Sequence, residues 1–77
     1  MHIATIPKNS REELRVSLDH FRGHDLVNLR VWFDAGEGEM RPGKKGLAVR
    51  IAHLPDLIGA LHDARQAAEG IGPKEAA

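Results

Sequence analysis

The sequence predicts an α+β fold in which a four-stranded antiparallel meander is followed by one C-terminal helix, in the order ββββα. Between residues 14 and 51, apolar and polar residues alternate in several runs, which is the period of half-buried strands. Glycine-rich and proline-rich segments separate these runs, as chain reversals require. From Leu54 the apolar residues recur at steps of three and four, which is the period of an amphipathic helix.

The first part of the chain is predicted to be an arm followed by a strand. Residues 1–11 show no sustained period and contain Pro7, so we expect a flexible N-terminal arm. The alternation begins at Leu14 and continues to Leu18, which predicts the first strand. Gly23 is the expected pivot of the turn that follows.

Residues 26–33 are the longest strand candidate. One face is apolar throughout, and the other face places Arg30 beside Trp32. The period of a strand therefore predicts a cation next to a flat aromatic ring on an exposed sheet surface. Gly36 and Gly38 then supply the positive backbone angles that a tight reversal needs.

Two shorter strands are expected after this reversal. Glu39–Pro42 forms the third strand, Pro42-Gly43 fits a second turn, and Gly46–Ile51 restores the alternation as the fourth strand. The helix from Leu54 has an apolar stripe that is suited to packing on a sheet. Gly70 ends the helix, and residues 70–77 are predicted to be a flexible tail.

The size of the chain favours self-association. Seventy-seven residues without cysteine give one small domain with a marginal core, and dimerisation would add buried area. We expect a homodimer whose interface contains Leu57, Ile58 and Leu61. No apolar run approaches the roughly 20 residues of a membrane span, and no secretory signal is visible. The absence of cysteine fits a reducing compartment, so the expected location is the cytoplasm, at the nucleoid in a bacterium.

Positive charge is concentrated in one segment of a neutral chain. The 11 basic and 11 acidic residues balance, which argues against bulk electrostatic binding of nucleic acid. Between Met40 and His53, however, there are four basic residues and no acidic one: Arg41, Lys44, Lys45 and Arg50. Cations that follow phosphates and flat side chains that stack on bases are what single-strand binding needs. The alternative for this segment is a solubilising loop.

Three segments of the sequence resemble a known family. These are Asp19-His20-Phe21-Arg22-Gly23, then Val27-Asn28-Leu29-Arg30, and Gly38-Glu39-Met40-Arg41-Pro42-Gly43-Lys44-Lys45-Gly46. Together they are similar to the single-stranded-DNA-binding domain of the transcriptional coactivator positive cofactor four and its short bacterial relatives. The resemblance covers residues 12–69. It implies a dimer of curved ββββα chains whose basic and aromatic ridges bind single strands largely without sequence preference.

The resemblance also implies which residues bind. At positions where the family uses aromatic, basic or backbone contacts, this chain has Phe21, Arg22, Arg30, Phe33, Arg41, Lys44, Lys45 and Gly46. Arg15, His24 and Trp32 complete the candidate set. His24 stands where the family commonly has Lys, and Asn28 stands where Asp is frequent. Either Trp32 or Phe33 faces the strand, and Phe21 is either a contact or a core plug at a strand end.

The predicted function is binding of single-stranded DNA or RNA in support of transcription, replication or repair, with the transcription or replication machinery as partner. The alternative is a small dimeric adaptor that binds a protein through its sheet edge and helices. The five histidines form no metal-ligand pattern, and neither serine has the setting of a nucleophile. We therefore expect no catalytic residue, no metal and no cofactor.

Overall fold

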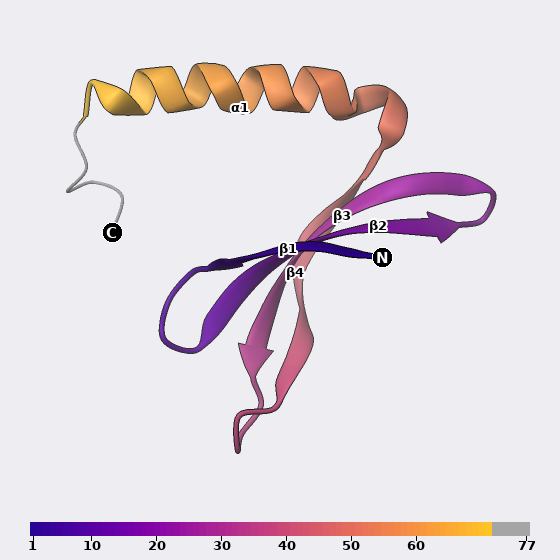
Figure 1. Cartoon of the computed structure of the whole chain (residues 1–77), viewed down its shortest axis with the longest axis vertical. Coiled ribbons are helices and arrows are strands. Elements are labelled where there is room, and N and C mark those ends of the chain that lie inside the picture. Colours follow the sequence, from indigo (N-terminus) through magenta and orange to yellow (C-terminus); the bar gives the residue numbers. More distant parts are fainter. Residues whose placement is uncertain (72–77) are drawn as a thin grey trace.

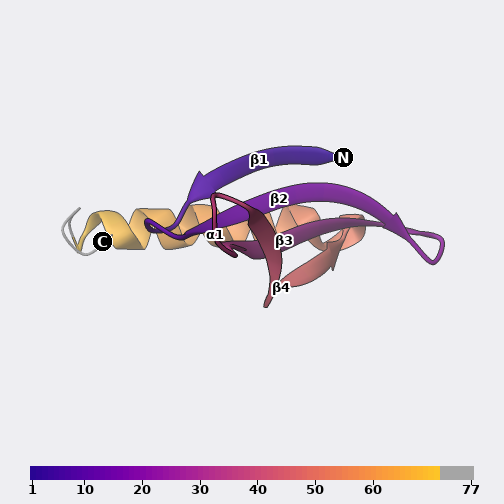
Figure 2. The ribbon, with the colours of Figure 1, turned by 90° about the horizontal axis from the view of Figure 1, so that it is seen from below.

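The computed structural model describes residues 1–71 and shows one antiparallel sheet followed by a helix (Figure 1). The sheet has the order β1-β2-β3-β4, so each strand pairs with its neighbour in the chain. Figure 2 shows the four strands following one another across the sheet. The predicted α+β fold of four strands and one helix is confirmed. The elements are β1 (His2–Pro7), β2 (Glu12–Phe21), β3 (His24–Asp34), β4 (Met40–Arg50), the 3₁₀ turn η1 (Ile51–His53) and α1 (Leu54–Glu69).

Strand β1 occupies the segment that was expected to be a flexible arm, so that expectation is wrong for residues 2–7. The strand pairs antiparallel with β2 and places Ile6 opposite Leu14. A turn organised by Asn9 joins the two strands, because its side-chain oxygen accepts hydrogen bonds from the backbone N–H groups of Arg11 and Glu12, both at 2.9 Å. This local bond lets a polar, proline-containing stretch reverse between two paired strands.

Strands β2 and β3 form a long hairpin that fixes the two faces of the sheet. Arg22 and Gly23 at its tip have φ angles of 51° and 80°, as a two-residue type I′ turn requires. The resulting register sets Leu14 opposite Val31 on the apolar face. Side chains directly opposite each other share a face, so the odd-numbered residues of β2 and the even-numbered residues of β3 lie on the other, largely polar face.

Strand β4 is continuous from Met40 to Arg50, so the predicted second turn at Pro42-Gly43 is wrong. The register instead shifts there: Arg30 faces Gly46, whereas Trp32 faces Pro42. Two residues of β3 therefore span four residues of β4, which is a bulge rather than a reversal. The predicted number of four strands is correct, but their assignment differs. The prediction missed β1, and the two short strands predicted at Glu39–Pro42 and Gly46–Ile51 belong to the single strand β4.

Helix α1 does not cover the sheet of its own chain, so the single chain does not show the expected packing of its apolar stripe on a sheet. No residue of the helix is buried, and Figure 1 shows it standing apart from the strands. Among the described residues only Val27 is a buried hydrophobic side chain. The helix starts with Pro55 in its first turn and Asp56 next to the positive end of its dipole. No helix in residues 1–71 is long and apolar enough to cross a membrane. Most of the predicted tail, residues 72–77, lies outside the described residues.

Candidate nucleic-acid interface

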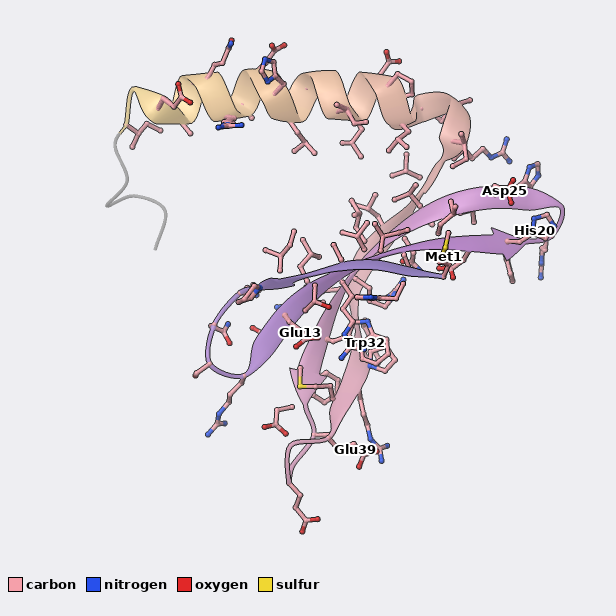
Figure 3. The ribbon with its side chains drawn as sticks, viewed as in Figure 1. Met1, Glu13, His20, Asp25, Trp32 and Glu39 are labelled. Atoms are coloured by element: carbon pink, nitrogen blue, oxygen red, sulfur yellow. The ribbon has the colours of Figure 1, made fainter. Side chains whose placement is uncertain are left out.

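The polar face of the sheet carries a stacked cation and aromatic ring. The register places Glu13 opposite Trp32 and Arg15 opposite Arg30. The Arg15 guanidinium lies over the indole of Trp32, 3.9 Å from the ring centroid, and Glu13 pairs with the same guanidinium. Figure 3 shows Trp32 on the side of the sheet that faces away from α1. We call this surface the Trp32 face, and its aromatic and guanidinium planes are both suited to stacking on bases.

Arg30 links the Trp32 face to the bulge of β4. Its Nη1 donates a hydrogen bond to the backbone carbonyl of Gly43 at 3.0 Å. On the opposite strand Gly46 lies so close to β3 that a Cβ there would sit 2.5 Å from the Leu29 carbonyl oxygen and 2.9 Å from the Arg30 Cα. The two glycines of the sequence Gly-Lys-Lys-Gly are therefore required by the structure, because they allow the backbone of the bulge to lie close to β3.

An open hollow of about 500 Å³ lies on the Trp32 face. It extends from Trp32 and Pro42 at one end to Asp19 at the other, and its wall is rich in hydrogen-bonding groups. The lining residues are Met1, His2, Arg15, Ser17, Asp19, Asn28, Arg30, Trp32 and Pro42. The sequence predicted Arg15, Arg30 and Trp32 at this surface but missed the polar residues at the Asp19 end.

The Asp19 end of the hollow holds a fixed carboxylate. The Ser17 hydroxyl donates to Asp19 Oδ2 at 2.7 Å, and the Met1 α-amino group lies 3.5 Å from Oδ1. The hydrogen bond from Ser17, followed by the nearby positive charge, lowers the pKa of the Asp19 carboxyl, and partial burial only opposes this. Asp19 is therefore ionised at neutral pH. The β2–β3 register would have identified Asp19. Once the turn at Gly23 is fixed, Ser17 lies opposite Asn28, and Asp19 shares their face because alternate residues of β2 point to the same side.

The tip of the β2–β3 hairpin presents a second, exposed group. Phe21 is 59% exposed and the Arg22 guanidinium lies 5.2 Å from its ring centroid. Phe21 is therefore not a core plug within this chain. His24 faces Phe21 across the strand pair, and His20 Nδ1 lies 2.9 Å from Asp25 Oδ1 at the same tip (Figure 3).

The bulge of β4 gathers a third group around Phe33. Phe33 is 41% exposed and lines a hollow of about 230 Å³ together with Lys44, Lys45 and Glu12. The pKa of Glu12 is lowered, chiefly by hydrogen bonds from Asn9 and Lys8 and to a lesser extent by the charge of Lys45. A negative group thus shares this hollow with the lysines.

The candidate residues from the sequence do not form one continuous patch. Phe33 faces Glu12 in the register and so lies on the opposite side of β3 from Trp32. Arg41 faces Phe33 across the strands and pairs with Glu39 at 3.3 Å. The two aromatic rings between which the sequence left a choice are therefore both accessible, on opposite faces near the edge strand β4.

The expected dimer residues lie on an uncovered helix. Leu57 is half-buried, whereas Ile58 and Leu61 are each 58% exposed. Within residues 1–71, no group of three or more His, Asp or Glu side chains is placed to hold a metal ion.

These features define a class of small domain: one twisted antiparallel sheet with an aromatic and basic face, followed by a helix that its own sheet leaves uncovered. The chain belongs to the transcriptional coactivator p15 (PC4) family, which it matches over residues 8–60. The resemblance drawn from the sequence is thereby confirmed.

Individual relatives agree with this assignment. A Neurospora crassa protein, provisionally named an RNA polymerase II transcriptional coactivator, is 43% identical over 44 residues, which are 57% of this chain and 25% of that protein. The chain therefore spans about a quarter of the length of this relative. The crystal structure of a PC4 homolog from Burkholderia pseudomallei has a TM-score of 0.79 at 26% identity and covers 84% of this chain and 88% of that chain.

A solved complex also belongs to this group of similar structures. MoSub1, crystallised with single-stranded DNA, has a TM-score of 0.61 at 25% identity, covering 90% of this chain and 80% of that chain. The bacteriophage T5 homolog of PC4, with a TM-score of 0.62 at 21% identity, shares the fold.

Proposed function

We propose that this protein binds single-stranded DNA largely without sequence preference, and that the Trp32 face is the main contact surface. The observation that carries this proposal is the Arg15 guanidinium stacked 3.9 Å above the indole of Trp32, beside Arg30. Planar groups of this kind stack on any base, and the cations contact phosphates, so the surface is suited to a flexible strand whose bases are free. The MoSub1 complex with single-stranded DNA supports the same reading.

The bulge and the hairpin tip extend this surface under the proposal. Phe33 with Lys44 and Lys45 lies at the edge strand β4, and Phe21 with Arg22 lies at the far end of the β2–β3 hairpin. Because Phe33 and Trp32 lie on opposite faces of β3, a strand that crosses the Trp32 face reaches Lys44 and Lys45 by turning around the edge strand β4. RNA presents the same phosphates and bases, so it is a second ligand of the same class, and the role is to hold open strands during transcription, replication or repair.

We further propose that the binding unit is a homodimer. Only Val27 is buried among the described residues, and no residue of the apolar stripe of α1 is buried within the single chain. A second copy carries the same uncovered stripe, so pairing the helices with each other and with the apolar sheet faces would supply the core that a single chain lacks. Leu57, Ile58 and Leu61 are the residues we assign to this interface.

Substitution of the stacked pair tests the binding proposal. Trp32→Ala and Arg15→Ala should each weaken binding of a labelled 20-nucleotide single strand by about 1–3 kcal/mol, because each removes one stacking plane. His62→Ala on the exposed side of α1 is the control and should bind like the unmodified protein. Unchanged affinity in both Trp32→Ala and Arg15→Ala, with folding intact by circular dichroism, would remove the Trp32 face from the site.

A further inference from the structure

The hollow on the Trp32 face has one end that is unlike a phosphate-binding surface. Asp19 lies there with its side chain 44% exposed, and the Ser17 hydroxyl holds its carboxylate in place at 2.7 Å. The carboxylate also takes hydrogen bonds from the Met1 α-amino group and from Asn28, and its exposed part can accept further ones. The Met1 α-amino group lies 3.5 Å from Oδ1 and balances the charge of this carboxylate, so its exposed oxygens are suited to a neutral hydrogen-bond donor such as the edge of a base.

Asn28 adds to the acceptor character of this end. It faces Ser17 across the strand pair and lines the same hollow. Within residues 1–71 its Oδ1 is the buried side-chain oxygen without a hydrogen-bond partner. Buried acceptors are nearly always paired, so an unpaired one just behind the wall of a binding hollow indicates a place for an ordered water, through which a donor of the ligand can be bound.

We propose that this acceptor-rich end reads one base of the bound strand and prefers guanine. The inference rests on the proposed function, since it concerns the specificity of the same surface. Guanine presents two adjacent donors on its Watson–Crick edge, N1–H and the 2-amino group, and a carboxylate accepts both at once. Adenine and cytosine present one donor beside an acceptor, and thymine presents one donor between two acceptors, so none of them fits Asp19 equally well.

The Asp19 end of the hollow lies too far from the stacked Arg15 and Trp32 for one base to contact both. Arg15 and Asp19 are four residues apart on β2, which corresponds to about 13 Å at the rise of a strand. One base therefore stacks at Trp32 while a different base of the same strand reaches Asp19. Arg30 lies opposite Arg15 in the register, at the stacked end of the hollow, where it can contact a phosphate of the strand. Stacking and charge bind the strand without regard to sequence, and the base at Asp19 adds a preference for guanine.

The test uses heptanucleotides with a single variable position, TTTXTTT, in which X is guanine, hypoxanthine, adenine, cytosine or thymine. Each competes with a labelled thymidine heptamer for the full-length protein, and fluorescence anisotropy reports the competition. A single guanine per strand avoids quadruplex formation. Hypoxanthine is the sharpest comparison, because it differs from guanine only by the missing 2-amino group. The protein variants are Asp19→Asn and, as a control with the same change of charge on the exposed side of α1, Asp63→Asn.

We expect the guanine strand to bind about fivefold more tightly than the hypoxanthine and thymine strands, as a bidentate contact to a base edge implies. Asp19→Asn should reduce this ratio to within twofold, and Asp63→Asn should keep it. Equal binding of all five strands, or a guanine preference that survives in Asp19→Asn, would overturn the inference and leave single-strand binding intact. Failure to bind any heptamer or a 20-nucleotide strand would overturn the proposed function as well.

Discussion

Truncation of Leu61 tests whether the uncovered helix forms the dimer interface. Leu61 is 58% exposed in the single chain. Full burial of a leucine side chain contributes about 1.5–3 kcal/mol, so covering the exposed part contributes about 1–2 kcal/mol. A symmetric interface contains two copies of the residue, and Leu61→Ala should therefore weaken the dimer by about 2–4 kcal/mol. At about 1.4 kcal/mol for each factor of ten, the dissociation constant should rise about 30- to 700-fold.

Sedimentation equilibrium over a dilution series measures this change directly. The matched control is His62→Ala, which removes the neighbouring side chain on the polar side of the same helix and should leave the dissociation constant unchanged. Circular dichroism at high protein concentration checks that the variant keeps its helix. A monomeric unmodified protein at micromolar concentration would refute the reasoning, and so would a Leu61→Ala dimer as tight as the unmodified one.

Three further predictions concern β3–β4 packing, phosphate contacts and acid stability. Gly46→Ala should lower the thermal midpoint by a shift equivalent to about 1–3 kcal/mol, because the new Cβ would lie 2.5 Å from a β3 carbonyl oxygen; an unchanged midpoint would contradict the packing described. Lys44→Ala and Lys45→Ala should each reduce the slope of log affinity against log salt by about 0.7, and a slope that stays constant would exclude phosphate contacts at the bulge. The folded state lowers the pKa of Asp19 below its ordinary value of 3.8, so its stabilising contribution is complete above that value and disappears as the pH falls through the lower folded value. Thermal midpoints measured from pH 5 to pH 2 should show this loss, and Ser17→Ala should reduce it; an identical profile in that variant would contradict the assigned cause.

The fold class was predictable because the strand and helix periods extend over long stretches. Strand β1 was not, because it is short, ends in Pro7 and is followed by Asn9, which are signals of irregular structure. Its pairing with β2 is decided by the bonds from Asn9 to the backbone of Arg11 and Glu12, which depend on the turn and not on the strand composition.

The Pro42-Gly43 signal illustrates a different limit. Proline and glycine mark both turns and bulges, and local composition does not distinguish them. The distinction lies in the pairing with β3, where Gly43 and Gly46 both approach the partner backbone too closely for a Cβ. The apolar stripe of α1 likewise predicted packing on a sheet, but a stripe alone does not say whether that sheet belongs to the same chain or to a second copy.

Part of the candidate site followed from strand periodicity alone. Alternation placed Arg30 beside Trp32, and the register agrees. The stacking of Arg15 on Trp32 needed the register between β2 and β3, which the turn at Arg22-Gly23 sets. Asp19 was visible only as one of several polar residues on its strand, because its role depends on the hydrogen bond from Ser17 and on the hollow that they line together.

The most direct test of the central claim compares single-stranded and duplex oligonucleotides. Fluorescence anisotropy of labelled 20-nucleotide strands at two salt concentrations, with the emission of the sole tryptophan, Trp32, followed in parallel, measures preference, charge dependence and proximity together. We expect tighter binding of the single strand, a loss of affinity at higher salt and quenching of Trp32 on binding. Absence of binding at low salt would contradict this expectation and would favour a protein partner for the sheet and helix instead.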